Sequence, residues 1–171
     1  MIDGSNVFMD LRVDDLYKLQ FELDQRIFDI HNVNRKQTQR ERMLALLIEL
    51  GEMINETRCF KFWSNKGPNY REVILEEYGD GLHFLLSLGI DLNDQQQIKQ
   101  SIVVNDDVVG LILKVYQKMI DLSINFNIES LNIAFAYYLA LAEKLDFSAD
   151  DIRTYYLKKN QINHQRQDHR Y

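Results

Sequence analysis

The sequence predicts an all-α fold, a multi-helix bundle within a single domain. One proline and seven glycines among 171 residues indicate long helices, because both residue types favour turns and destabilise helix interiors. Apolar residues recur at intervals of three and four, whereas the alternation typical of strands is almost absent. The length suits one domain with a sizeable core, so we assign residues 1–171 to a single domain.

The composition excludes several classes of protein. A formal net charge of −6 argues against binding of a nucleic-acid polymer, which depends on a basic surface. No apolar run approaches the ~20 residues of a membrane-spanning helix, and Asp3 and Asp10 are unlike a signal peptide. The single cysteine, Cys59, cannot form an internal disulfide, which fits a reducing compartment. We therefore expect a cytoplasmic protein with no membrane partner.

The first two helices follow from apolar spacing. Asp14 or Asp15 can cap a first helix that ends near His31, followed by a polar stretch at 32–39. A second helix is expected over about 39–60. Its apolar residues cover an arc of roughly 220°, which is far broader than the stripe of a surface helix and predicts a central position. Acidic residues occupy the narrow remaining sector of this helix, namely Glu49, Glu52 and Glu56.

The third helix is expected over 70–88, after a loop at 64–69 that contains Gly-Pro. Gly89 is a plausible residue to end it in a left-handed conformation. Gly79 and Gly81 lie within this helix, where each costs about 1 kcal/mol relative to alanine. We interpret both glycines as positions where a neighbour or a ligand approaches the backbone closely.

The second half of the chain contains three more predicted helices. Residues 91–107 are polar and rich in Gln and Asn, so we expect a lid, an insertion or a weakly held connection there. A fourth helix can begin at Asp106 or Asp107, and a very apolar fifth helix is expected over 131–145. The alanines of the fifth helix would permit tight packing, for example in a subunit interface. Ser148 with Asp151 resembles a capping box that opens the last helix.

Two pairs of acidic residues on consecutive helices carry the functional signal. Glu49 with Glu52, and Glu77 with Asp80, are each three residues apart, so each pair projects from one side of its helix. If the helices pack side by side, four carboxylates face one groove. That much like charge in a partly buried groove calls for divalent cations, which take oxygen ligands. We predict these four residues as metal ligands.

The C-terminal helix adds polar donors at one-turn spacing, which could bind phosphate oxygens through charge-assisted hydrogen bonds. They include Lys159, Asn160, Asn163 and Arg166. The sequence contains no phosphate-binding Gly-rich loop, no dinucleotide motif and no zinc pattern.

The motifs in this order resemble the dimeric all-α dUTP diphosphatases, which are part of the MazG-like nucleotide pyrophosphatase superfamily. The family pattern consists of Glu-x-x-Glu, a Phe-Lys-x-Trp stretch, Glu-x-x-Asp and a C-terminal Lys-Asn-x-x-Asn-x-x-Arg-Gln. This chain supplies Glu49/Glu52, Phe60-Lys61-Phe62-Trp63, Glu77/Asp80 followed by His83-Phe84, and Lys159-Asn160, Asn163 and Arg166-Gln167. The resemblance extends from about residue 14 to the C-terminus. The ending Arg170-Tyr171, in place of Gly-Tyr, departs from it.

The resemblance implies Mg2+-dependent hydrolysis of dUTP to dUMP and pyrophosphate, with dUDP also accepted, by a homodimer with a four-helix metal-binding core. Two or three Mg2+ ions would bridge the carboxylates and the phosphates. A metal-activated water would attack the phosphate chain, with Glu49 or Glu52 accepting its proton. The implied substrate-binding residues lie in three regions of the chain: Gln20 and Asp24; Lys61, Trp63, His83 and Phe84; and Lys159, Asn160, Asn163 and Arg166.

Three alternatives remain open at this point. A MazG-like pyrophosphatase could keep the metal site but act on dCTP or a damaged nucleotide. A di-iron bundle would need two carboxylate-x-x-His motifs, and only Asp80 with His83 offers one. A non-catalytic helical interaction protein could share the fold, although all four predicted ligands are present.

Overall fold

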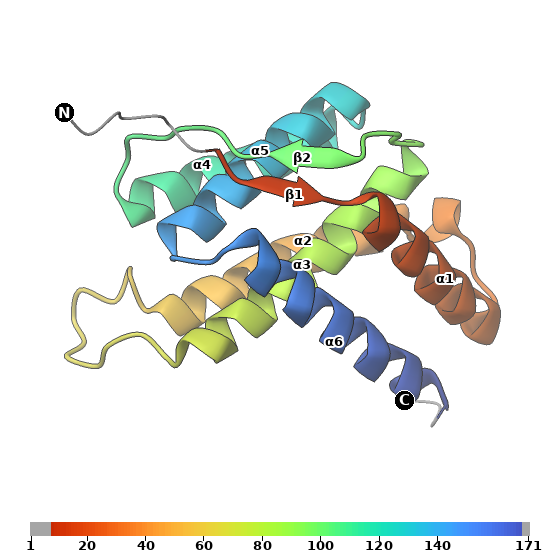
Figure 1. Cartoon of the computed structure of the whole chain (residues 1–171), viewed down its shortest axis with the longest axis horizontal. Helices are drawn as coiled ribbons and strands as arrows, with labels where there is room; N and C mark the ends of the chain where they lie inside the picture. The colour runs from red at the N-terminus through yellow and green to blue at the C-terminus, as the bar shows by residue number, and fades with distance from the viewer. Residues whose placement is uncertain (1–7, 169–171) are drawn as a thin grey trace.

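The computed structural model describes residues 8–168, and it confirms the predicted all-α fold (Figure 1). Within this range two short strands accompany the helices, β1 (Asp10–Arg12) and β2 (Ile98–Gln100). The helices are α1 (Asp14–His31), α2 (Arg35–Thr57), α3 (Arg71–Asp91), α4 (Val108–Ile124), α5 (Ile128–Lys144) and α6 (Ala149–Asp168). No helix in this part of the chain is both long and apolar enough to cross a lipid bilayer.

Helix α3 is the centre of the bundle. It packs along α2, from which residues 58–70 separate it, and it also contacts α1, α5 and α6 (Figure 1). Its apolar residues are enclosed on several sides, and Leu75, Tyr78, Leu82 and Leu85 are fully buried. Because α3 touches the N-terminal and C-terminal helices alike, side chains from distant parts of the sequence meet around it.

A two-stranded antiparallel sheet joins the start of the chain to the connection between α3 and α4. Leu11 pairs with Lys99 in this sheet, and the backbone N–H of Met9 donates to Ser101 Oγ at 2.8 Å. The Lys99 ammonium is buried and forms a salt bridge with Asp94 at 2.5 Å. Residues 91–107 thus include a strand and a buried ion pair.

Several helix ends differ from the sequence-based expectation. Helix α2 begins at Arg35, before the predicted start, because Asn34 and Gln37 form a reciprocal capping box in the stretch read as a polar separator. Helix α3 continues through Gly89, so the predicted end there was wrong. A Cβ on Gly89 would lie only 2.5 Å from the Tyr17 hydroxyl, so glycine allows α1 to pack closely. The predicted capping box of Ser148 and Asp151 is confirmed, because the backbone N–H of each residue donates to the side chain of the other.

Two expectations about packing concerned α2 and α5. Helix α2 is not enclosed all round in this chain, because Leu44 and Ile48 are 59% and 50% exposed. The small residues of α5 pack tightly, as predicted, but within the chain, and their part in a subunit interface stays a prediction. Alanines 134, 140 and 142 are buried in the core of the chain itself, where they let α4 and α5 pack together.

Candidate active site

Three glutamates from two adjacent helices form an acidic cluster. Glu49 and Glu52 lie on α2, Glu77 lies on α3, and one carboxylate oxygen from each falls within 4.8 Å of the others. The predicted convergence of α2 and α3 produces this arrangement, because the two helices pack along their length. Carboxylate oxygens are the ligands that Mg2+ prefers, so this donor set fits a divalent cation.

Burial and nearby negative charges make Glu49, Glu77 and Asp80 harder to ionise. Partial burial raises the pKa of Glu49 to about 7, and the negative charges of Asp80, Glu52 and Glu77 act in the same direction. Burial also raises the pKa of Glu77 and of Asp80. All four predicted ligands are therefore within electrostatic reach of one another, and a cation between them would relieve the repulsion.

Asp80 faces a cation from another helix. Its Oδ2 is 2.6 Å from Lys159 Nζ on α6, which also lies 3.3 Å from Glu76 Oε1. Burial lowers the pKa of Lys159, but its bonds to Asp80 and Glu76 outweigh this effect, so the net shift is upward. The structure thus places three predicted ligands in one cluster and the fourth at its edge, beside a lysine that stays charged.

A pocket of about 260 Å3 adjoins the acidic cluster and lies among α1, α3 and α6. Glu49 and Asp80 form its acidic side. Most of the predicted substrate-binding residues line it as well, although they come from three separate segments: Gln20, Asp24, His83, Phe84, Lys159, Asn163 and Arg166. Gln167 of the C-terminal motif also lines the pocket, and Leu23 and Ile27, which the sequence analysis did not assign to the substrate, complete the wall.

A hydrogen-bond network fixes the polar end of this pocket. Gln20 Oε1 is 2.7 Å from His83 Nδ1, and Gln20 Nε2 donates to Asp24 Oδ1 at 2.7 Å. Burial lowers the pKa of His83 to about 3, so its ring is neutral. The other oxygen of Asp24 accepts from Arg35 and Ser87. Both oxygens of Asp24 are therefore engaged, and its contacts orient Gln20.

Three predicted substrate residues lie outside the pocket lining. Lys61 donates to Asn55 at 2.6 Å, and its ammonium lies over the Phe60 ring. Trp63 is 65% exposed and packs edge-on against Phe60 and Phe62. Asn160 is buried, with Nδ2 3.5 Å from the Leu19 carbonyl on α1. The assignment of these residues to the substrate stays a prediction.

A buried tyrosine pair supports the acidic cluster, and the sequence analysis missed it. The rings of Tyr78 and Tyr138 stack at 4.2 Å, and each hydroxyl donates to the other residue's carbonyl oxygen. A Cβ on Gly81 would lie 2.3 Å from the Tyr138 hydroxyl and 3.9 Å from Glu49 Cβ. The predicted close approach at Gly81 is thus confirmed, whereas Gly79 has no neighbour within 4 Å of such a Cβ.

Comparison with known proteins agrees with this geometry. The model of the dUTPase family matches residues 12–171, which is nearly the whole chain. The chain belongs to the dUTPase family. Membership makes it a dUTP diphosphatase and implies hydrolysis of dUTP. The dUTPase family is typically metal-dependent, and this chain has an acidic cluster that could hold a metal ion. No curated protein matches the chain.

The raised pKa of Glu49 in this dUTPase predicts how stability changes with pH when metal is absent. The folded chain holds this proton more tightly than the unfolded chain, because its pKa is about 7 instead of the ordinary 4.5. Metal-free protein should therefore lose stability as pH rises from about 4.5 to 7. Melting temperatures in EDTA would test this, because the Glu49→Gln variant should lose less stability over the same pH range. An equal decline in both proteins would contradict the assignment.

Proposed function

We propose that this dUTPase hydrolyses both dUTP and dUDP to dUMP, with Mg2+ held by Glu49, Glu52, Glu77 and Asp80. The observation that carries the proposal is the cluster of three glutamates beside a pocket lined by the predicted nucleotide-binding residues. Four carboxylates suit two or three Mg2+ ions better than one, because a nucleotide adds further negative charge. When bound, Mg2+ neutralises the phosphate chain and activates water for attack.

Glu49 is the proposed base. In the metal-free chain, burial and the neighbouring negative charges raise the pKa of Glu49 to about 7, and its carboxylate could accept a proton from the attacking water. Glu52 is the alternative, since it belongs to the same cluster. Glu49 also lines the pocket, whereas Glu52 is exposed, and this difference favours Glu49.

Basic side chains on α6 would bind the phosphate oxygens. Lys159 is held at the pocket by Asp80, and Arg166 lines the same wall with Asn163, whose Oδ1 it contacts at 3.4 Å. If Asp80 exchanged its salt bridge with Lys159 for a metal ion, the Lys159 ammonium would become available to the substrate. Lys61 and Trp63 would reach the substrate of their own chain only if residues 58–70 move. Alternatively, these two side chains would act on the substrate of a neighbouring protomer.

Gln20 is the residue that we propose recognises the uracil ring of the nucleotide. The amide group of Gln20 donates one hydrogen to Asp24, and its Oε1 faces His83. The second hydrogen of this amide is therefore left as a donor of fixed orientation. A fixed donor favours the O4 carbonyl of uracil over the amino group of cytosine, which is itself a donor. Phe84 supplies an apolar wall that would disfavour a ribose 2′-hydroxyl.

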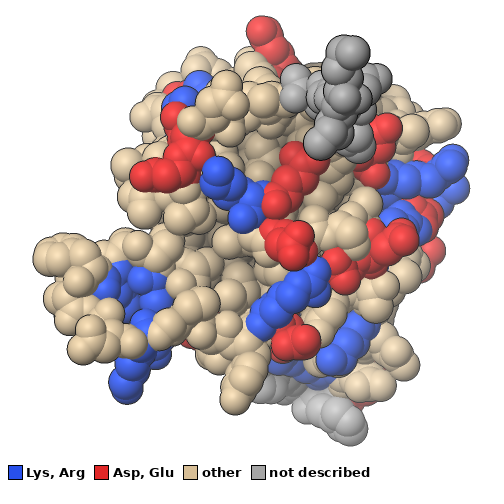
Figure 2. All heavy atoms as spheres, turned by 60° about the vertical axis from the view of Figure 1, so that its left-hand side comes forward, with Lys and Arg blue, Asp and Glu red and all other residues tan. Residues whose placement is uncertain are grey.

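The proposed partners are the nucleotide and a second copy of the chain. Figure 2 shows acidic and basic side chains interspersed over one face, not a continuous basic surface. Together with the net charge of −6, this disfavours a nucleic-acid polymer as a partner. The homodimer is proposed from the resemblance to the dimeric enzymes.

A nucleotide panel tests the substrate assignment. We expect Mg2+-dependent release of pyrophosphate from dUTP and of phosphate from dUDP, with dCTP and UTP at least roughly 100-fold slower in kcat/KM. EDTA should abolish the activity. Faster hydrolysis of dCTP or of another nucleotide would instead indicate a MazG-like pyrophosphatase of different specificity, and no turnover with any nucleotide would refute the proposed activity.

A further inference from the structure

Two arginines and two aspartates form a largely buried ion network behind the pocket. Arg35 lies 2.9 Å from Asp24 Oδ2 and 3.1 Å from Asp91 Oδ1. Arg42 lies 2.6 Å from Asp91 Oδ2. The four side chains come from α1, α2 and α3, and even the most exposed of them, that of Arg35, is only 21% exposed. Replacement of such a network by apolar side chains is often neutral for stability, so its place next to Gln20 points to another role.

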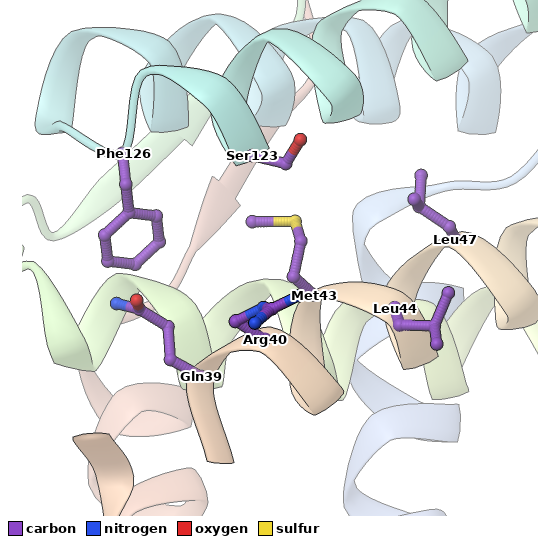
Figure 3. A pocket seen from close by; sticks show the side chains of 7 residues that line it. All are labelled: Gln39, Arg40, Met43, Leu44, Leu47, Ser123 and Phe126. Carbon is purple, nitrogen blue, oxygen red and sulfur yellow. The ribbon is translucent and has the colours of Figure 1, made fainter. Parts of the chain in front are cut away.

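The three arginines in the first half of α2 lie on different sides of the helix. Arg40 is exposed and lines the groove between α2 and α4 that Figure 3 shows. Arg35 and Arg42 instead reach α3, where Arg42 also donates to Ser87 Oγ at 2.9 Å. The Phe28 ring lies 5.4 Å from the guanidinium of Arg35 and 5.6 Å from that of Arg42. Both guanidinium groups are therefore fixed by an aromatic contact as well as by hydrogen bonds.

Asp24 connects this network to the pocket, which it lines. Its Oδ2 accepts from Arg35 at 2.9 Å and from the Ser87 hydroxyl at 2.5 Å, and its Oδ1 accepts from Gln20 Nε2 at 2.7 Å. Ser87 Oγ in turn accepts from Arg42, so the hydroxyl hydrogen is left for Asp24. Three donors thus surround the Asp24 carboxylate, and two of them are positioned by arginines of α2.

Asp24 determines which end of the Gln20 amide faces which partner. Gln20 Oε1 is 2.7 Å from His83 Nδ1 and 3.0 Å from the Tyr156 hydroxyl. A neutral imidazole nitrogen and a hydroxyl can each donate or accept, so both would also fit the amide turned by 180°. An ionised carboxylate only accepts, so Asp24 requires the NH2 group of Gln20 on its side. The charge of Asp24 therefore decides whether Gln20 offers the base a hydrogen-bond donor or an acceptor.

We infer that Arg35 is a positioning residue for base selection, because it holds Asp24 as the charged acceptor that orients Gln20. Ser87 acts beside it on the same oxygen of Asp24. The inference rests on the proposed recognition of the base by Gln20 and extends base selection to residues behind the pocket lining. Loss of Arg35 removes the cation that balances Asp24, so Gln20 can turn its oxygen to the base. An amide oxygen accepts from the amino group of cytosine, which the present orientation disfavours.

Arg35→Gln tests the inference through the choice between dUTP and dCTP, measured as Mg2+-dependent release of pyrophosphate. The ratio of kcat/KM for dUTP to that for dCTP should fall about tenfold. For dUTP the rise in KM should exceed the fall in kcat, because the acidic cluster keeps its contacts. Arg35→Lys retains the positive charge and should restore the ratio to within about threefold of the wild type.

Ser87→Ala is a second test that does not depend on the folding of Arg35→Gln. It removes the other donor to Asp24 Oδ2 but leaves every charge of the network paired. The same ratio should fall about threefold, because Arg35 still holds the carboxylate. Circular dichroism melting curves would show that each variant is folded at the temperature of the assay.

Arg153→Gln is the matched control. Arg153 also ties α1 to another helix, through a salt bridge of 2.5 Å with Asp15, and its side chain is 26% exposed, but it does not line the pocket. This variant loses the same charge and an ion pair to the same helix, so it should keep the wild-type ratio even if its stability falls.

The outcomes separate base selection from a purely structural role. A wild-type ratio in both Arg35→Gln and Ser87→Ala, or an equal fall in Arg153→Gln, would overturn the inference while leaving the proposed hydrolysis of dUTP intact. A wild-type enzyme that does not prefer dUTP over dCTP would overturn the proposed recognition by Gln20 and this inference with it.

Discussion

Glu49→Gln is expected to reduce kcat for dUTP by at least roughly 100-fold while leaving the metal-free protein as stable as the wild type, or more stable, at pH 8. The substitution keeps the size of the side chain but removes the group with the most raised pKa among the clustered acids. It also removes repulsion with Glu52 and Glu77. Kinetics with saturating Mg2+ and melting curves in EDTA would measure both effects.

Glu41→Gln is a suitable control for this prediction. Glu41 is exposed on the same helix and does not belong to the acidic cluster or the pocket, so its replacement should change neither kcat nor stability appreciably. Addition of Mg2+ should raise the melting temperature of the wild type more than that of Glu49→Gln, because a ligand stabilises the state that binds it. Full activity of Glu49→Gln would contradict the role of this residue.

The acidic cluster could be predicted because its signal is local. Each pair of acids is fixed on one side of its helix by spacing alone, and only the packing of two consecutive helices had to be assumed. The positions of Asp24 and Lys61 could not be predicted in the same way. Asp24 is engaged by Arg35 and Ser87, which belong to other helices, and Lys61 is held by a contact with Asn55. Such contacts depend on tertiary packing.

For the fold as well, features that depend on neighbouring residues could be predicted, whereas features that depend on tertiary packing could not. Helix periodicity predicted each helix, and the capping box at Ser148 was correctly assigned, because both depend on neighbouring residues. The broad apolar arc of α2 is real, but the central position that it predicted does not extend to Leu44 and Ile48, which remain exposed. A periodic pattern shows that a surface is apolar. It does not tell whether the same chain or a second copy covers that surface.

Gly81→Ala should destabilise the fold by about 1–3 kcal/mol and reduce kcat roughly 100-fold, because the new methyl group would lie 2.3 Å from the Tyr138 hydroxyl. The clash can be relieved by a shift of the buried Tyr138 side chain or by a movement of α3 away from α5. Helix α3 carries Glu77 and Asp80 on either side of Tyr78, which stacks on Tyr138. A shift of these carboxylates relative to Glu49 would impair the site even in molecules that remain folded. Urea unfolding and steady-state kinetics would measure the two effects separately.

Gly79→Ala provides a control on the same helix. Apart from the adjacent residues and the backbone of α3 itself, no atom lies within 4 Å of a Cβ at this position, so alanine should stabilise α3 by up to about 1 kcal/mol through its higher helix propensity. Tyr138→Phe combined with Gly81→Ala should recover part of the lost stability, since the hydroxyl is gone and the nearest ring carbon is at 3.2 Å. Because Tyr138→Phe alone forfeits its hydrogen bond to the Tyr78 carbonyl, recovery shows that the clash outweighs that bond. Equal effects of alanine at both glycines would contradict this account and place the cause in helix propensity instead.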